Sequence, residues 1–106
     1  MSIRIAIVEN IALLASSSAQ LAYEKDVPIA DVPAELVCMF CDDLYRPKST
    51  QFISEFSESE LKDLAHLYGL LVEASKIEAS TVTELLKKER WRTVMQAAKN
   101  LTEAFA

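Results

Sequence analysis

The sequence predicts an all-α protein, a compact antiparallel bundle of five or six helices that forms one domain over residues 1–106. Apolar residues recur every three or four positions along most of the chain, which is the spacing of a helix face. The chain contains 1 glycine, which excludes folds and phosphate-binding loops that need repeated glycine turns. A chain of this length buries roughly two-thirds of its unfolded surface, which suffices for one core.

The first segment, Ile3–Glu24, is predicted as one helix because its large apolar residues share a side: Ile3, Ile7, Ile11, Leu14 and Leu21. The alternating isoleucines at its start would also suit a strand, but a single strand would leave its backbone hydrogen bonds unpaired. Pro28 predicts a loop over residues 25–32. Asp31 is then the expected N-cap of a second helix, Pro33–Leu44, with proline in its first turn.

A turn and a short helix follow. The second helix is expected to end at Tyr45–Lys48, because Pro47 disfavours helical geometry in the residue before it. Ser49 or Thr50 can then cap a short helix over Gln51–Phe56.

A long helix is predicted to begin at a capping box. The Ser57 hydroxyl can accept from the backbone N–H of Glu60, while the Glu60 carboxylate reaches back to the N–H of Ser57. This helix should run to about Lys76 with an apolar stripe made of Leu61, Leu64, Ala65, Tyr68, Leu71, Val72 and Ser75. Gly69 costs about 1 kcal/mol relative to alanine within a helix, so its presence predicts a close helix crossing.

The C-terminal part repeats the capping pattern. Thr81 and Glu84 predict the start of a short helix through Lys88. A new apolar stripe follows out of phase with it, which predicts a break near Lys88–Glu89: Trp91, Val94, Met95, Ala98, Leu101, Thr102 and Phe105.

Charge indicates the kind of partner. The formal net charge is -5, so the molecule should repel nucleic acid and anionic membranes and attract a basic protein. The longest uncharged stretch, residues 10–23, is shorter than the ~20 residues that a membrane span needs. Two cysteines are too few for a disulfide scaffold, and we therefore expect a cytoplasmic protein.

The residues that could carry chemistry lack the companions that chemistry needs. A zinc site at Cys38 and Cys41 would require about four ligands, and a redox pair normally lies at a helix N-terminus rather than in mid-helix. Both cysteines are therefore interpreted as buried apolar residues. His66 has no nucleophile motif beside it and is interpreted as a packed or partly exposed side chain. No catalytic residue, metal or cofactor is expected.

Asp42 and Asp43 lie in the last turn of a predicted helix, where the helix dipole disfavours negative charge. Three interpretations of this pair remain open: both side chains are solvated at the surface, one has an internal role such as pairing with Arg46 or Lys48, or the pair contacts a cationic partner. A metal site is disfavoured, because adjacent helical residues point about 100° apart.

Basic residues surround an aromatic side chain near the C-terminus. Lys87, Lys88, Arg90 and Arg92 flank Trp91, a composition that can indicate nucleic-acid binding. Because the apolar stripe assigns Trp91 to the core, we interpret the four bases as a solvated helix face.

Two patterns carry a resemblance to a known family. The first is Asp42–Ser49 followed by Phe52, Phe56–Ser57 and Glu60–Leu61, and the second is Trp91–Ala98 leading to Leu101. Both are similar to patterns in small immunity proteins of bacterial polymorphic toxin systems, which include the contact-dependent growth inhibition type. Together they cover about half of the chain.

The resemblance implies a cytoplasmic protein without enzymatic activity that binds and blocks the C-terminal toxin domain of a cognate effector, commonly a nuclease. A nuclease surface is basic, so an acidic inhibitor gains association rate and specificity from charge matching. We expect Tyr45 to be the anchor of this contact, with surrounding acids as the charged contributors: Asp42, Asp43, Glu55, Glu58 and Asp63.

Other functions remain open at this stage. A helical homodimer could use Ile3, Ile7 and Ile11, a nucleic-acid-binding regulator could use residues 87–92, and a metal-dependent enzyme could use the paired aspartates. A monomer with no direct contact to nucleic acid or membrane is favoured.

Overall fold

The computed structural model describes residues 2–27 and 31–105, and in these ranges the protein contains seven α-helices, one π-helix and no strand. The predicted all-α class is confirmed, and the helical segments outnumber the five or six expected. They are α1 (Ile3–Ala15), α2 (Ser17–Asp26), α3 (Val32–Cys38), the π-helix η1 (Met39–Leu44), α4 (Thr50–Ser54), α5 (Glu58–Ala74), α6 (Val82–Leu86) and α7 (Glu89–Ala104).

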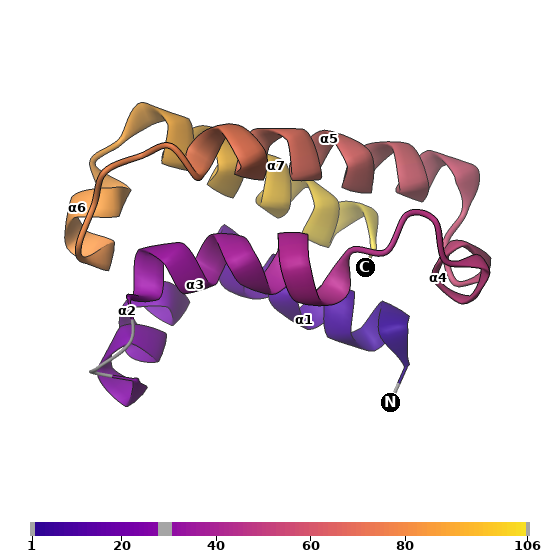
Figure 1. The fold of residues 1–106 in the computed structure, drawn as a ribbon, viewed down its shortest axis with the longest axis horizontal. Helices are drawn as coiled ribbons and strands as arrows, with labels where there is room; N and C mark the ends of the chain where they lie inside the picture. Colours follow the sequence, from indigo (N-terminus) through magenta and orange to yellow (C-terminus); the bar gives the residue numbers. More distant parts are fainter. Residues whose placement is uncertain (1, 28–30, 106) are drawn as a thin grey trace.

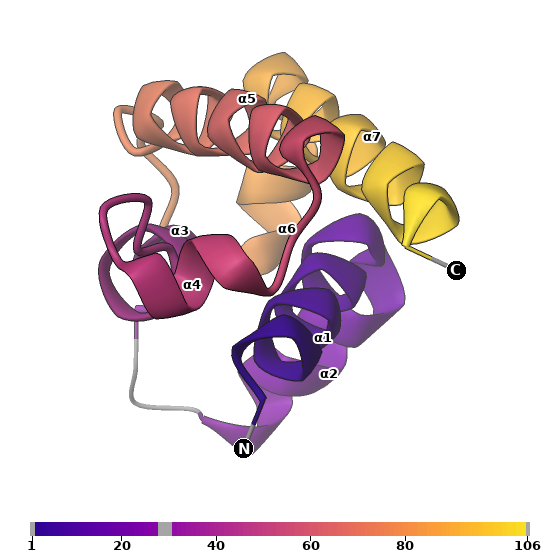
Figure 2. The same ribbon diagram turned by 90° about the vertical axis from the view of Figure 1, so that its right-hand side faces the viewer.

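The helices form two layers around one core (Figures 1 and 2). α5 and α7 pack side by side in one layer, and α1 and α3–η1 make up the other, with α1 packed closely on α7. α2 and α6 contact each other at one end, while α4 lies at the other end (Figure 1). The core between the layers includes fully buried side chains from every layer: Ile7, Ile11, Leu36, Phe40, Leu64, Leu71, Trp91 and Val94.

The predicted single helix Ile3–Glu24 is wrong, because the chain bends by 103° between α1 and α2. Ser16 has an extended backbone, and its hydroxyl accepts from the N–H of Ala19 at 3.1 Å, which starts a new helix. The bend leaves Leu21 37% exposed. Within the described ranges, no single helix is long and apolar enough to cross a membrane.

A buried glutamine secures this bend. The amide nitrogen of Gln20 donates to the carbonyls of Leu13 and Leu14 at 3.2 and 3.1 Å, at the end of α1 where carbonyls lack intrahelical partners. The Leu13 carbonyl also accepts from the backbone N–H of Ser16 at 3.3 Å. The amide oxygen of Gln20 accepts from the indole N–H of Trp91 at 3.0 Å. One fully buried side chain therefore connects α1, α2 and α7.

Substitution of Gln20 should test this connection. Gln20→Leu removes the partner of the buried Trp91 N–H and of the Leu14 carbonyl, and we expect the free energy of unfolding to fall by about 3 kcal/mol. Urea denaturation measures the change. The control variant Gln51→Leu, at an exposed glutamine of α4, should change the free energy of unfolding by less than about 0.5 kcal/mol. An unaltered midpoint in Gln20→Leu would contradict the role.

The second helix begins within one residue of its predicted start and ends at Leu44 as predicted, but its second half is a π-helix. Asp31 caps α3 by accepting from the N–H of Ala34 at 3.3 Å, whereas Pro28 of the predicted loop lies outside the described residues. After Cys38 the helix widens into η1, where the N–H of Tyr45 donates to the carbonyl of Phe40 at 2.9 Å. This five-residue closure is the π-helical pattern, which occurs frequently at functional sites.

The capping box of α5 is confirmed. The N–H of Glu60 donates to the Ser57 hydroxyl at 3.1 Å, and the N–H of Ser57 donates to the Glu60 carboxylate at 2.8 Å. The buried face of α5 is rotated from the predicted stripe and consists of Leu64, Leu67, Leu71 and Ala74. The rotation follows from packing against α7 on one side, which leaves Tyr68 and Val72 each 38% exposed on the other.

The predicted close helix crossing at Gly69 is wrong. Gly69 lies on the exposed side of α5, and a Cβ built there meets no atom within 4 Å. Because the core face of α5 is rotated away from this position, the glycine contacts no neighbouring helix.

Alanine at this position should therefore stabilise the fold. We expect Gly69→Ala to raise the free energy of unfolding by about 1 kcal/mol, because alanine restricts the unfolded chain and favours the helix. The reverse change at an exposed position one turn earlier, Ala65→Gly, should lower it by a similar amount. Thermal melts of both variants measure the difference, and destabilisation by Gly69→Ala would indicate a contact at this position.

The last two helices follow the sequence prediction closely. The Thr81 hydroxyl accepts from the N–H of Glu84 at 3.2 Å and starts α6, and the predicted break lies at Lys88, which precedes α7. The buried side of α7 contains Trp91, Val94, Ala98 and Leu101. Ser49 rather than Thr50 caps α4.

Candidate binding surface

Asp42 and Asp43 are exposed at the end of η1. Neither forms an ion pair within residues 2–27 and 31–105, so the pairing with Arg46 or Lys48 considered above is not observed there. Asp43 lies beside the start of α1 in a hollow that Ser2 also lines. Asp42 instead lies against the Cys38 thiol, which donates a hydrogen bond to it.

Tyr45 is held within an aromatic cluster. Its ring stacks on Phe40 with centroids 5.3 Å apart, meets Phe52 edge-on at 5.6 Å, and lies 4.9 Å from the ring of Tyr68. Partial burial raises the pKa of the Tyr45 hydroxyl, and the nearby Tyr68 hydroxyl adds to the shift. Tyr45 is thus a pre-positioned, half-buried ring, and Tyr68 forms the more exposed part of the same aromatic surface.

Glu55 has internal hydrogen-bond partners. Its carboxylate accepts from the Ser2 hydroxyl at 2.7 Å and from the backbone N–H of Arg4 at 3.1 Å, which caps the first turn of α1. These bonds, that from Ser2 first, lower the pKa of Glu55. Of the acids expected to meet a partner, Glu55 is therefore the one that already holds two helices together.

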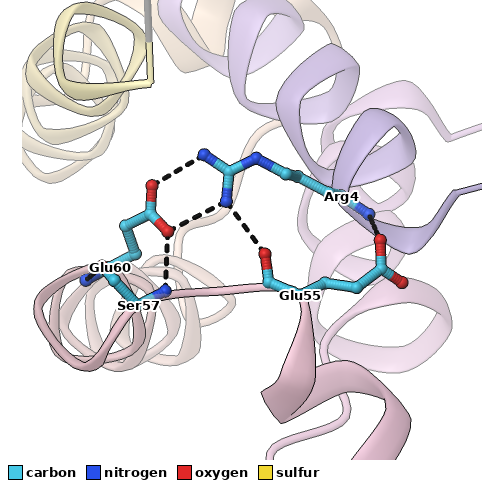
Figure 3. A network of polar contacts seen from close by, with 4 residues as sticks. All are labelled: Arg4, Glu55, Ser57 and Glu60. Carbon is cyan, nitrogen blue, oxygen red and sulfur yellow. Dashed lines mark hydrogen bonds and ion pairs between the residues drawn. The ribbon is translucent and has the colours of Figure 1, made fainter.

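Arg4 joins the same end of the molecule to the start of α5 (Figure 3). Its guanidinium donates two hydrogen bonds to the Glu60 carboxylate, at 2.9 and 2.7 Å, and a third to the backbone carbonyl of Glu55 at 3.0 Å. The guanidinium also lies over the rings of Phe56 and Phe105, at 5.4 and 5.0 Å from their centroids. The bonds from Arg4, followed by that from the Ser57 N–H, lower the pKa of Glu60 to about 2.

This network predicts acid sensitivity. Because folding lowers the pKa of Glu60 from 4.5 to about 2, the native state binds fewer protons than the unfolded chain in this interval. The stabilisation is complete above pH 4.5 and is lost as the pH falls towards 2. Urea unfolding at successive pH values should show this decline, and Glu60→Gln should flatten it.

Glu58→Gln is the matched control, since the exposed Glu58 side chain forms no hydrogen bond within the described residues. It should keep the pH slope of the unmodified protein. Equal slopes in all three proteins would contradict the assignment to Glu60.

Glu58 and Asp63 are both exposed on α5 and lie apart from the aromatic surface. Glu58 is in the first turn of α5, where the helix dipole favours a negative charge. Asp63 lines a hollow between α5 and α7 together with His66 and Asn100. Asp42 and Tyr45 therefore lie close in the chain, at the end of η1 and just after it, whereas Asp63 lies on the side of α5 that faces α7.

The interpretation of the cysteines as buried is corrected for Cys38, whose side chain is exposed, while Cys41 is half-buried. Val37 and Phe40 take the core positions of this segment instead. Burial, followed by the charge of Asp42, raises the pKa of Cys41 to about 11. Partial burial and the hydrogen bond with Asp42 raise the pKa of Cys38 as well, so both groups are protonated thiols with low nucleophilicity at neutral pH.

The other residues considered for chemistry or assembly are dispersed. His66 is exposed, and the described residues contain no group of three or more histidine, cysteine or acidic side chains that could hold a metal ion. Trp91 is fully buried and therefore cannot stack on a nucleobase. The lysine and arginine side chains that flank it in the chain are exposed. Ile7 and Ile11 are also fully buried, which removes them from any dimer surface.

One feature of the surface was missed by the sequence reasoning. Residues 31–45 contain four acids and no base, and all four are exposed along α3 and η1: Asp31, Glu35, Asp42 and Asp43. The absence of lysine and arginine over this range could have identified the segment. Asp31 serves as the cap of α3, whereas Glu35, Asp42 and Asp43 form no ion pair with a base in the described ranges. Arg46 lines the same hollow as Asp43.

Comparisons with protein-family models, with curated proteins and with solved structures found no match for this chain. Function must therefore be argued from the surface itself and from the resemblance described above.

Proposed function

We propose that the chain is a non-enzymatic, cytoplasmic immunity protein that binds the toxin domain of a cognate bacterial effector and blocks it. The partner is a basic domain, in keeping with a nuclease of a contact-dependent growth inhibition system. The observation that carries the proposal is the exposed acidic side of α3 and η1, whose carboxylates form no ion pair in the described ranges. It is followed directly in the chain by Tyr45, which forms an aromatic surface with Tyr68.

The placement of Asp42 and Asp43 supports an external partner. At the end of a helix they oppose the helix dipole, so they contribute no local stability. They also form no ion pair with the described bases. Exposed carboxylates of this kind accelerate association with a basic surface through long-range attraction.

The two resembling patterns occupy defined parts of the fold. Asp42–Ser49 forms the end of η1 and the turn that leads to α4, and Trp91–Ala98 forms the first half of α7. Within the first pattern, Tyr45 combines partial exposure with a fixed ring position, as expected of an anchor residue that loses little freedom on binding.

We expect the gene beside this one to encode the effector, and co-expression with its C-terminal toxin domain tests the proposal. We expect cells that produce the toxin to survive when this protein is present, and the purified pair to form a complex. Death at an unchanged rate with this protein in excess would refute the proposed function.

The charge-reversed variant Asp42→Lys, Asp43→Lys, Glu58→Lys serves as the comparison. It should fold normally by circular dichroism, since none of the three side chains bonds to another helix in the described ranges. Its association with the toxin should be slower by about tenfold at low salt, with the difference decreasing at high salt. Unchanged association kinetics would reject this surface as the contact.

A further inference from the structure

α3–η1 and α5 contact each other and run alongside one another (Figure 1), and the surface strip between them is called the groove below. At one end it is closed by the contact of Tyr45 with Tyr68, whose ring centroids are 4.9 Å apart. At the other end it opens into a cleft of about 280 Å³ between Cys38 on α3 and Ser75 just after α5. The acidic Asp31 also lines the cleft, and the rest of its lining is mainly small and apolar: Pro33, Ala34, Val37, Ala74, Ile77, Ala79 and Leu85.

The edge of the groove on α5 is apolar and unpartnered. Tyr68 and Val72, one helical turn apart, are each 38% exposed. Ala65 and Gly69 on the same side are exposed as well, with open space in front of Gly69. A helix that needs only its buried stripe for folding would normally present polar residues here, so this face has the composition of a contact surface.

The opposite edge of the groove is acidic. Glu35 lies three residues before Cys38 and Asp42 four residues after it, so helical spacing puts both on the same side of α3–η1 as Cys38, which lines the cleft. Both side chains are exposed. The base nearest in sequence to the cleft end of α5 is Lys76, which pairs with Glu73 at 3.4 Å. The acidic edge therefore keeps its negative charge, and a ligand for this groove must combine an apolar side with cationic side chains.

We infer that the groove between α3–η1 and α5 receives a basic amphipathic helix of the partner protein, with an apolar side chain in the cleft beside Cys38 and cationic side chains against Glu35 and Asp42. This inference rests on the proposed function, because it names the part of the toxin domain that the acidic side recognises. Binding of a helix in a groove uses apolar anchors at helical spacing, and Tyr68 and Val72 meet the side of such a helix. Glu55, which is bonded internally, and Asp63, which faces α7, lie outside this contact.

A synthetic amphipathic helical peptide of leucine and lysine serves as the probe, with a leucine and glutamate peptide of the same pattern as its control. NMR amide-shift mapping on the full chain should place the lysine peptide along α3, η1 and the exposed side of α5. The variant Glu35→Lys, Asp42→Lys should weaken its binding by about tenfold. Glu9→Lys, Glu103→Lys makes the same change of charge at exposed sites on α1 and α7 and should weaken it by less than about twofold.

If the two double variants weakened binding equally, attraction would follow net charge alone and the inference would be overturned. If the glutamate peptide bound as well as the lysine peptide, binding would follow apolarity alone, which would also overturn it. Amide shifts confined to other helices would overturn the inference as well.

An experiment with the toxin domain separates this inference from the proposed function. If Glu35→Lys, Asp42→Lys still protects cells as well as the unmodified protein does, the groove is refuted and the immunity function stands. If the groove binds the lysine peptide as expected and no protection occurs, the immunity function is refuted.

Discussion

The fold depends on a single buried amide that bonds to the end of one helix and to an indole at once. α1 stops after Ala15, and in the interior the Gln20 side chain donates to the carbonyls of Leu13 and Leu14 in its last turn. The same amide accepts the Trp91 N–H, so the sharp bend after α1 and the seating of α7 are coupled. Since Trp91 is the largest fully buried side chain, the packing of both layers follows from this three-way connection.

The opposite end of α1 is secured by charge. Arg4 lies between the Glu60 carboxylate, the Glu55 carbonyl and two phenylalanine rings, and so joins α1 to the α4–α5 junction and to the end of α7. Exposed ion pairs contribute little on their own. This one is bidentate, only partly exposed and shared with a capping box, so its effect is to fix the position where three segments meet.

The sequence predicts most helix starts, because capping is local: Asp31, Ser49, Ser57 and Thr81 each act on a backbone N–H three residues ahead. It misses the cap at Ser16, because this serine lies within a stretch whose apolar spacing predicts one continuous helix. It also misses η1, because the wider turn of a π-helix produces no apolar spacing that distinguishes it from an α-helix. The candidate site is only partly predictable for a similar reason. Asp42 and Tyr45 could be singled out by their unusual position, whereas the internal role of Glu55 depends on partners more than fifty residues away in the chain.

The carboxylates of this protein fall into two separate groups. Glu55 and Glu60 connect helices, and their replacement would disturb the scaffold. Glu35, Asp42 and Asp43 form no ion pair within the described chain, so these positions can accept other side chains while the architecture persists. A domain built in this way can change the chemistry of one side of its surface at little cost to its own folding.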